Sequence, residues 1–275
     1  MDESQLNRAR MDARQPDGLA PVVMHQRWSD LLFLHWRYPV EQIQATLPPG
    51  LGLKVDAFDR SAWVGVVPFA MRRVRPRGCP PLPWLSWFLE LNVRTYVIGP
   101  DDRPGVWFYS LDANQPLAVA LARRLFHLPY QHARMRSWRR DGVVRHHCRR
   151  RHAATPAHFR YRPDGRPLTA QAGGLEFFLI ERYYLFAHDQ SRGRLLRGQV
   201  HHQPYRICPV DCDQWSMLPL EWNGLRSGRA DRAPDHACCA GQVDVQVHAP
   251  RTVDPCEVAD GHKDRFTGSE DATAP

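Results

Sequence analysis

An acid, an amide and a base occupy alternate positions in the segment FLELNVRTYV, residues 88–97. Strand side chains alternate with a period of two, so Glu90, Asn92 and Arg94 would share one face of a β-strand, opposite an apolar face. A carboxylate can transfer protons, and a guanidinium can hold an anion. This polar face could therefore line a site for an anionic or carbonyl-bearing small molecule.

A second interpretation stays open, in which the polar face is merely solvated. Glu90 and Arg94 are four residues apart, so their Cα atoms would lie about 13 Å apart, too far for a direct ion pair. Each must then find its partner on a neighbouring strand, in water or in a ligand. Half-exposed antiparallel strands often carry such a face. Phe88 and Tyr96 bracket the polar trio and favour an enclosed one.

Two other polar residues have both a structural and a functional interpretation. Asp112 follows the apolar run VWFYSL and precedes a predicted helix, so it is either a helix cap or a site carboxylate. His201 shares a predicted strand face with Gln199 and Gln203. A single histidine of this kind acts as a hydrogen-bonding group or as an acid–base residue.

Motifs that would define a cofactor or a metal site do not occur in the sequence. It contains no GxSxG elbow, no P-loop and no dinucleotide-binding glycine fingerprint. Its seven cysteines lack the repeated two-residue spacing of a zinc ribbon. The histidines are not combined with carboxylates in the spacing of a metal-binding motif. We therefore expect no cofactor and no metal.

The elements that would position these residues follow from alternation and turn signals. Strands are expected at residues 28–38, 62–71, 88–97, 104–113, 159–163, 183–189, 197–205 and 241–250, with a hairpin at 132–151. Short helices are expected at 40–50, 116–126 and 173–183. Many strands with a few non-alternating helices favour an α+β protein built on a large antiparallel sheet or closed β-barrel.

The strongest helix signal lies at residues 116–126. Leucines recur at i, i+4 and i+8 from Leu117, and a proline occupies the first turn. Asp112 or Asn114 would supply the N-terminal cap.

Length and composition indicate one ordered domain between two tails. The middle of the 275-residue chain, residues 24–250, shows neither a repeat nor a linker. Residues 1–23 and 251–275 are polar and aperiodic, so we expect both to be disordered. No apolar run approaches the ~20 residues of a membrane span, and the N-terminus lacks the apolar core of a signal peptide. The irregular cysteines favour reduced thiols, hence a cytoplasmic location.

A basic charge balance supports an alternative function. The formal net charge is +8, and eight arginines with Trp138 among them fall within residues 134–151. A hairpin that turns at an Asp-Gly pair there could present a basic, partly aromatic face to nucleic acid. Such runs are also common on solvated outer faces, so nucleic-acid binding is the alternative and not the main hypothesis.

Several segments together resemble a known bacterial family that has no assigned function, the YqjF-like family. The resemblance covers roughly residues 24–250 and rests on WSDLLFLHW, LPPGL, AWVGVVPFAM, FLELNVRTYV, GVWFYSLDA, ARRLFHLPY, IERY and VHHQPY. The family is similar in fold to acetoacetate decarboxylase, a cone-like antiparallel β-barrel flanked by short helices. The resemblance thus implies that the polar strand lines a barrel lumen.

The same resemblance argues against the chemistry of the decarboxylase. That enzyme forms a Schiff base through a lysine that follows a proline, whereas Pro129 is followed here by Tyr130 and Gln131. Lys54 lies two residues from Asp56 on one predicted strand face, where a carboxylate would stabilise its charged form. We therefore expect no Schiff base, and the sequence leaves open whether the chain is an enzyme or a binding protein.

The candidate site combines the polar strand with other polar residues, several of them in segments that match the family. Glu90 matches a site glutamate of the decarboxylase and is the candidate acid or base. The ligand-binding candidates are Asn92, Arg94, Tyr96, Asp112, Tyr130, Glu181, Arg182 and His201. The expected partner is a small molecule, bound or converted without a lysine.

Overall fold

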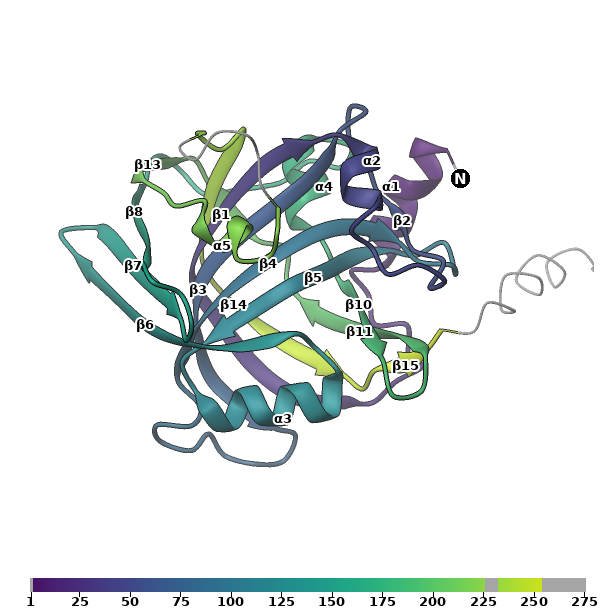
Figure 1. Cartoon of the computed structure of the whole chain (residues 1–275), viewed down its shortest axis with the longest axis horizontal. Coiled ribbons are helices and arrows are strands. Elements are labelled where there is room, and N and C mark those ends of the chain that lie inside the picture. Colours follow the sequence, from purple (N-terminus) through teal and green to yellow (C-terminus); the bar gives the residue numbers. More distant parts are fainter. Residues whose placement is uncertain (1, 226–231, 254–275) are drawn as a thin grey trace, which may run out of the picture.

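The computed structural model describes residues 2–225 and 232–253, and its strands form one continuous β-structure (Figure 1). A closed 7-strand barrel occupies its centre. The barrel strands are β1 (Val22–Tyr38), β3 (Ala62–Pro76), β4 (Phe88–Ile98), β5 (Pro104–Ala113), β10 (Tyr184–Asp189), β11 (Arg194–His202) and β14 (His236–His248). Neighbouring strands run antiparallel except for β5 and β10, which are parallel, and β14 closes the ring on β1.

A second, outer sheet continues from the barrel at β5. It consists of β6 (Tyr130–Arg140), β7 (Val143–Arg150), β8 (Ala157–Pro163) and β13 (Val210–Gln214). The predicted hairpin is present as β6 and β7. Asp141 and Gly142 both have positive φ, 52° and 76°, as a tight hairpin turn requires.

The outer sheet buries the second face of β4. Leu91 and Val93 belong to an apolar cluster that also contains Phe159 of β8, so this face packs against protein and not against water. The alternation in β4 therefore separates a barrel lumen from an outer core, and both faces are buried.

The remaining strands are short, and most of the helices lie at the two ends of the barrel, whereas α5 (Leu218–Glu221) lies at its side (Figure 1). The short strands are β2 (Lys54–Val55), β9 (Leu168–Thr169), β12 (Arg206–Cys208) and β15 (Arg251–Thr252). The helices are α1 (Glu3–Asp12), α2 (Val40–Gln44), α3 (Pro116–Phe126), α4 (Leu175–Ile180) and α5 (Leu218–Glu221). Helix α3 crosses one end, while α1, α2 and α4 gather at the other (Figure 1). No helix in the described ranges is long and apolar enough to traverse a bilayer.

The N-terminal segment differs from the expected disordered tail. Helix α1 begins with a capping box between Asp2 and Gln5, and its Arg10 is only 1% exposed. The guanidinium of Arg10 binds Asp56, 46 residues away in the sequence. Composition cannot reveal such an anchor, because it depends on contacts with residues far away in the sequence, such as this ion pair and that of Arg14 with Glu181. Of the expected C-terminal tail, residues 254–275 lie outside the described residues.

Helix α3 has the predicted bounds but not the predicted cap. Gln115 caps it, because its side chain accepts a hydrogen bond from the N–H of Leu117. Asp112 lies inside β5 instead. The stripe of leucines that begins at Leu117 is about half exposed, whereas Val119 is fully buried.

A bulge in β1 changes which side chains face the lumen. Asp30 has a positive φ of 55°, and the pairing of β1 with β3 shifts register between Ser29 and Leu34. As a result, Trp28 and Leu31 both line the lumen although they are three residues apart.

Candidate functional site

A cavity of about 630 Å³ fills much of the barrel lumen and extends to α3. Its volume lies within the usual range of small-molecule sites. Most of its lining is apolar. The polar contribution comes chiefly from the alternating residues of β4, joined by Arg182 just after α4.

The three alternating polar residues of β4 line this cavity. Glu90, Asn92 and Arg94 are 3%, 6% and 9% exposed, so the solvated interpretation of this face is wrong. Strand β4 carries them from the α3 end toward α4, because the Leu89 N–H bonds Asn114 near α3 whereas Arg94 reaches the Leu179 carbonyl of α4.

Glu90 is a buried acid held by a single phenol. The Tyr130 hydroxyl donates to Glu90 Oε2 at 2.8 Å. Burial raises the pKa of Glu90 to about 8; this hydrogen bond opposes the shift, and the nearby charge of Asp112 adds to it. A carboxyl group with a pKa near neutrality can both give and take a proton.

Arg94 is a buried cation without a carboxylate partner in the described part of the chain. Its Nη2 donates to the Leu179 carbonyl at 3.1 Å, and its guanidinium lies 5.7 Å from the ring centres of both Phe33 and Tyr96. The Nε atom is buried and has no hydrogen-bond acceptor. Aromatic faces and one carbonyl stabilise the cation only in part, so this guanidinium is chemically able to hold an anion.

A second unpaired polar atom lies on the same strand face. Asn92 Oδ1 is buried without a donor, two residues from Arg94. Buried polar atoms nearly always have partners, so two neighbouring exceptions on a cavity wall indicate a place for water or ligand.

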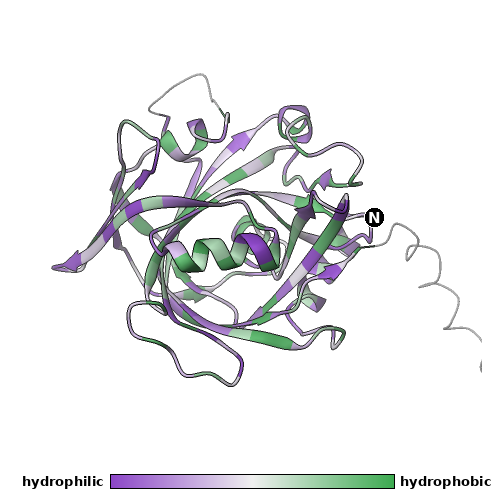
Figure 2. Ribbon diagram, turned by 60° about the horizontal axis from the view of Figure 1, so that its bottom comes forward, coloured by the Kyte–Doolittle hydropathy of each residue, from purple (hydrophilic) through white to green (hydrophobic). Residues whose placement is uncertain are grey.

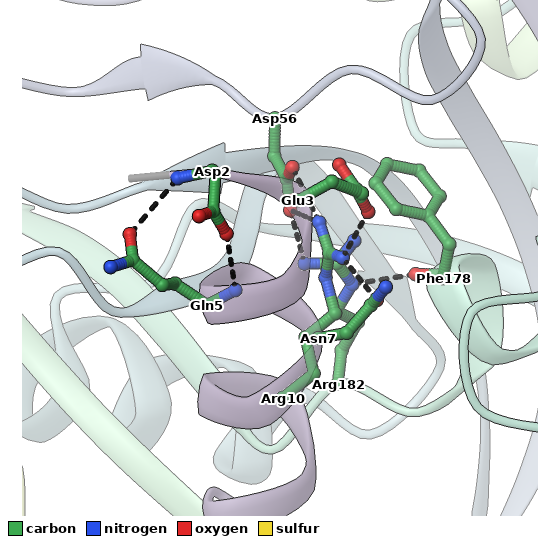
Figure 3. A network of polar contacts seen from close by, with 8 residues as sticks. All are labelled: Asp2, Glu3, Gln5, Asn7, Arg10, Asp56, Phe178 and Arg182. Atoms are coloured by element: carbon green, nitrogen blue, oxygen red, sulfur yellow. Dashed lines mark hydrogen bonds and ion pairs between the residues drawn. The ribbon is translucent and has the colours of Figure 1, made fainter.

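Arg182, at the inner end of the cavity, belongs to a buried network with Arg10 and Asp56 (Figure 3). Asp56 accepts from Arg182 at 2.6 Å and from Arg10 of α1 at 2.7 and 2.9 Å. Arg182 Nε also donates to the Phe178 carbonyl at the end of α4. Two guanidiniums thus share one buried carboxylate, and burial lowers the pKa of Arg182 to about 10.

Two of the other candidates lie close to the cavity in different roles. Tyr130 lines it and faces Glu90. Tyr96 is fully buried behind the lining; its hydroxyl donates to the Leu179 carbonyl at 2.9 Å and lies 2.8 Å from His35 Nε2. Tyr96 therefore supports Arg94 through its ring and has no free hydroxyl to offer a ligand.

Three candidates lie outside the cavity lining. Asp112 points toward the outer sheet and binds Arg150 at 2.7 and 2.8 Å, so it is neither a cap nor part of the lumen. Glu181 accepts from the Tyr205 N–H and is thereby fixed beside the wall. The ring of His201 contacts the Arg14 carbonyl of the N-terminal segment, which covers that strand face.

Two features of the site were not foreseen from the residues. Trp28 and Leu31 both face the lumen because of the bulge at Asp30. An unbroken alternation would have placed these two side chains on opposite faces of β1. Asp56 binds Arg10 and Arg182 and does not pair with Lys54, which is exposed. Positive φ at a non-glycine residue leaves no clear mark in a single sequence, although aspartate tolerates it better than most residues.

The position that resemblance assigns to the decarboxylase lysine is taken by a phenol. Tyr130 begins β6 directly after Pro129, and its hydroxyl contacts Glu90. The cavity-lining residues include no lysine in the described ranges. Across those same ranges, no cluster of three or more His, Cys, Asp or Glu could hold a metal ion.

The basic hairpin is partly engaged in ion pairs. Arg139 binds Asp30 of β1, and Arg150 binds Asp112 of β5. Trp138 packs edge-on against His147 of the neighbouring strand. Both of these arginines therefore join the outer sheet to the barrel.

The barrel has the acetoacetate decarboxylase-like fold. Acetoacetate decarboxylase from Legionella pneumophila superposes with a TM-score of 0.60 at 11% identity, over 87% of this chain and 91% of the other. An acetoacetate decarboxylase-like enzyme from Sphingomonas wittichii RW1 gives 0.55 at 16% identity, over 87% and 96%. The enduracididine biosynthesis enzyme MppR, complexed with the condensation product of pyruvate and imidazole 4-carboxaldehyde, gives 0.60 at 15% identity, over 86% and 92%. At these identities the likeness shows the fold alone.

Within this fold, the chain belongs to the DUF2071 family, described as an uncharacterized conserved protein, which it matches over residues 25–244. The uncharacterized protein YqjF of Bacillus subtilis (strain 168) is 38% identical over 193 residues, which are 70% of this chain and 77% of that protein. The predicted α+β barrel and the resemblance to a YqjF-like family are confirmed.

Proposed function

We propose that the chain binds a small anionic or carbonyl-bearing molecule inside the barrel. The observation that carries this proposal is Arg94, a buried guanidinium on a cavity wall with no carboxylate partner in the described ranges and an unpaired Nε. A desolvated cation of this kind is costly unless a counter-charge arrives. An anionic ligand would supply it.

The other polar groups would orient the ligand and handle protons. The unpaired Asn92 Oδ1 would accept a hydrogen bond from it, or the amide would turn and donate. Glu90 and Tyr130 form an acid pair on the same cavity, suited to proton transfer without a lysine. MppR, a protein of similar fold, is complexed with the condensation product of pyruvate and imidazole 4-carboxaldehyde, which supports a ligand of this kind here.

Nucleic-acid binding is not part of the proposal. Arg139 and Arg150, two arginines of the hairpin that would contact phosphates, already bind carboxylates of the barrel.

A thermal-shift screen of small carboxylates, keto acids and aldehydes tests the proposal. We expect ligand-dependent stabilisation that Arg94→Gln abolishes or weakens at least tenfold in apparent affinity. Arg134→Gln, an exposed arginine of the outer sheet, is the charge-matched control and should leave the shifts unchanged. Shifts that survive Arg94→Gln, or none at all, would contradict the proposal.

A further inference from the structure

The cavity changes character along its length. Its two arginines, Arg94 and Arg182, lie at the end closed by α4, as their bonds to the carbonyls of Leu179 and Phe178 show. Toward α3 the lining becomes mostly apolar, apart from the hydrogen-bonded pair of Glu90 and Tyr130. The apolar lining residues include Trp28, Leu31, Phe33, Val67, Phe69, Met71, Phe88, Leu111, Leu117, Leu121 and Leu128.

The apolar end is the one that reaches the surface. Leu82, Leu117 and Leu121 line the cavity and yet are 52%, 53% and 46% exposed. Helix α3 lies across this end of the barrel and carries apolar residues along much of its length (Figure 2). A side-chain bond from Gln115 to the Trp84 carbonyl joins the helix to the loop that contains Leu82.

The distance between the two ends suits an extended ligand. Phe88 and Arg94 lie six residues apart on β4, which is about 20 Å at the rise of a strand. Glu90, between them, is already bonded to Tyr130, so it need not meet a polar group of the ligand. A compact anion would fill the inner end and leave the apolar length empty.

We propose that the ligand is an amphipathic anion, an aliphatic carboxylate of medium chain length, with its head at Arg94 and its chain directed toward α3. This inference rests on the proposed function and adds the ligand class. The buried cation selects the charged head, and the apolar walls gain hydrophobic contact with each methylene. The exposed leucines would form the entrance through which the ligand reaches the cavity.

Calorimetric titration with acetate, butyrate, hexanoate, octanoate and decanoate, below micelle-forming concentrations, tests the ligand class. We expect affinity to rise by about fourfold for each added methylene until the cavity is filled. Octylamine, with the same chain but the opposite charge, should bind at least tenfold more weakly than octanoate.

Two variants of α3 test where the alkyl chain of the ligand lies. Ala122 is half-buried and lines the cavity, whereas Ala120 is exposed on the same helix. Ala122→Trp should weaken decanoate at least tenfold and butyrate less than twofold, and the matched control Ala120→Trp should change neither.

The outcomes separate this inference from the proposed function. Affinity that does not depend on chain length, or equal effects of the two tryptophan variants, would overturn the ligand class. Butyrate binding that still depended on Arg94 would then leave the proposed function standing. If no carboxylate binds in an Arg94-dependent way, both fail. The chain-length series on the unaltered protein decides the matter even if Ala122→Trp does not fold.

Discussion

At the scale of single residues, Glu90 is the acid of the cavity whose ionisation the fold alters in a measurable way. Its pKa is raised from 4.5 to about 8, chiefly by burial. An acid with a raised pKa holds more protons in the folded than in the unfolded state between these values. The contribution of Glu90 to the free energy of unfolding therefore falls as pH rises from about 4.5 to about 8.

Replacing Glu90 by glutamine should remove this pH dependence. We expect the stability of Glu90→Gln relative to the unaltered protein to rise across that pH window by on the order of 3 kcal/mol. Urea unfolding at a series of pH values measures the difference. Parallel curves for the two proteins would show that Glu90 ionises normally.

Tyr130 should control the same titration. Its hydroxyl donates to Glu90 and so favours the ionised carboxylate. Tyr130→Phe should therefore raise the pKa of Glu90 further, measured by carbon NMR of the side-chain carboxyl. An unchanged or lowered pKa would mean that the phenol does not donate to this acid in solution.

Schiff-base formation is expected to be absent. Tyr130 stands where the resemblance to the decarboxylase implies a lysine, and Lys54 is exposed on β2. Borohydride treatment in the presence of acetoacetate should leave the mass of the protein unchanged. A stable adduct mapped to Lys54 would restore the decarboxylase mechanism, because an imine requires an amine that is accessible and uncharged.

At the scale of elements, α1 is attached to the barrel through the buried guanidinium of Arg10. Arg10 binds Asp56 and lies 4.9 Å from the ring centre of Phe178 (Figure 3). Removing one partner of a buried ion pair costs about 3–5 kcal/mol when the other is left alone. Here Asp56 keeps Arg182, so the loss should be smaller.

Arg10→Met should lower the free energy of unfolding by about 1–3 kcal/mol, measured in urea. Arg8→Met is the matched control, because Arg8 is exposed on the same helix, and it should change stability by less than about 0.5 kcal/mol. Equal effects of the two substitutions would mean that α1 does not dock through Arg10.

At the scale of the whole molecule, the fold and the main polar wall were accessible from the sequence. Alternation in residues 88–97 correctly grouped Glu90, Asn92 and Arg94 on one face, because a strand has only two faces. The environment of each face could not be predicted, since the outer sheet that buries Leu91 comes from distant segments.

Other parts of the site depend on contacts between segments far apart in the chain. The bond from Arg10 to Asp56 spans 46 positions, and His201 is covered by the segment that contains Arg14. The flanking residues predicted that Asp112 would lie at the start of a helix. Its partner in the structure is instead Arg150, two strands away in the outer sheet. Local pattern predicts the direction of a side chain but not the partner that it meets.

The most direct test of the account is to observe Arg94 while a ligand binds. The Nε–H of Arg94, buried and without an acceptor, should give a side-chain NMR signal that Arg94→Gln removes. Titration with octanoate should shift this signal in a saturable way and leave the signal of the exposed Arg134 in place. Saturable binding of octanoate with the Arg94 signal unmoved would contradict the claim that this residue anchors an anion inside the barrel.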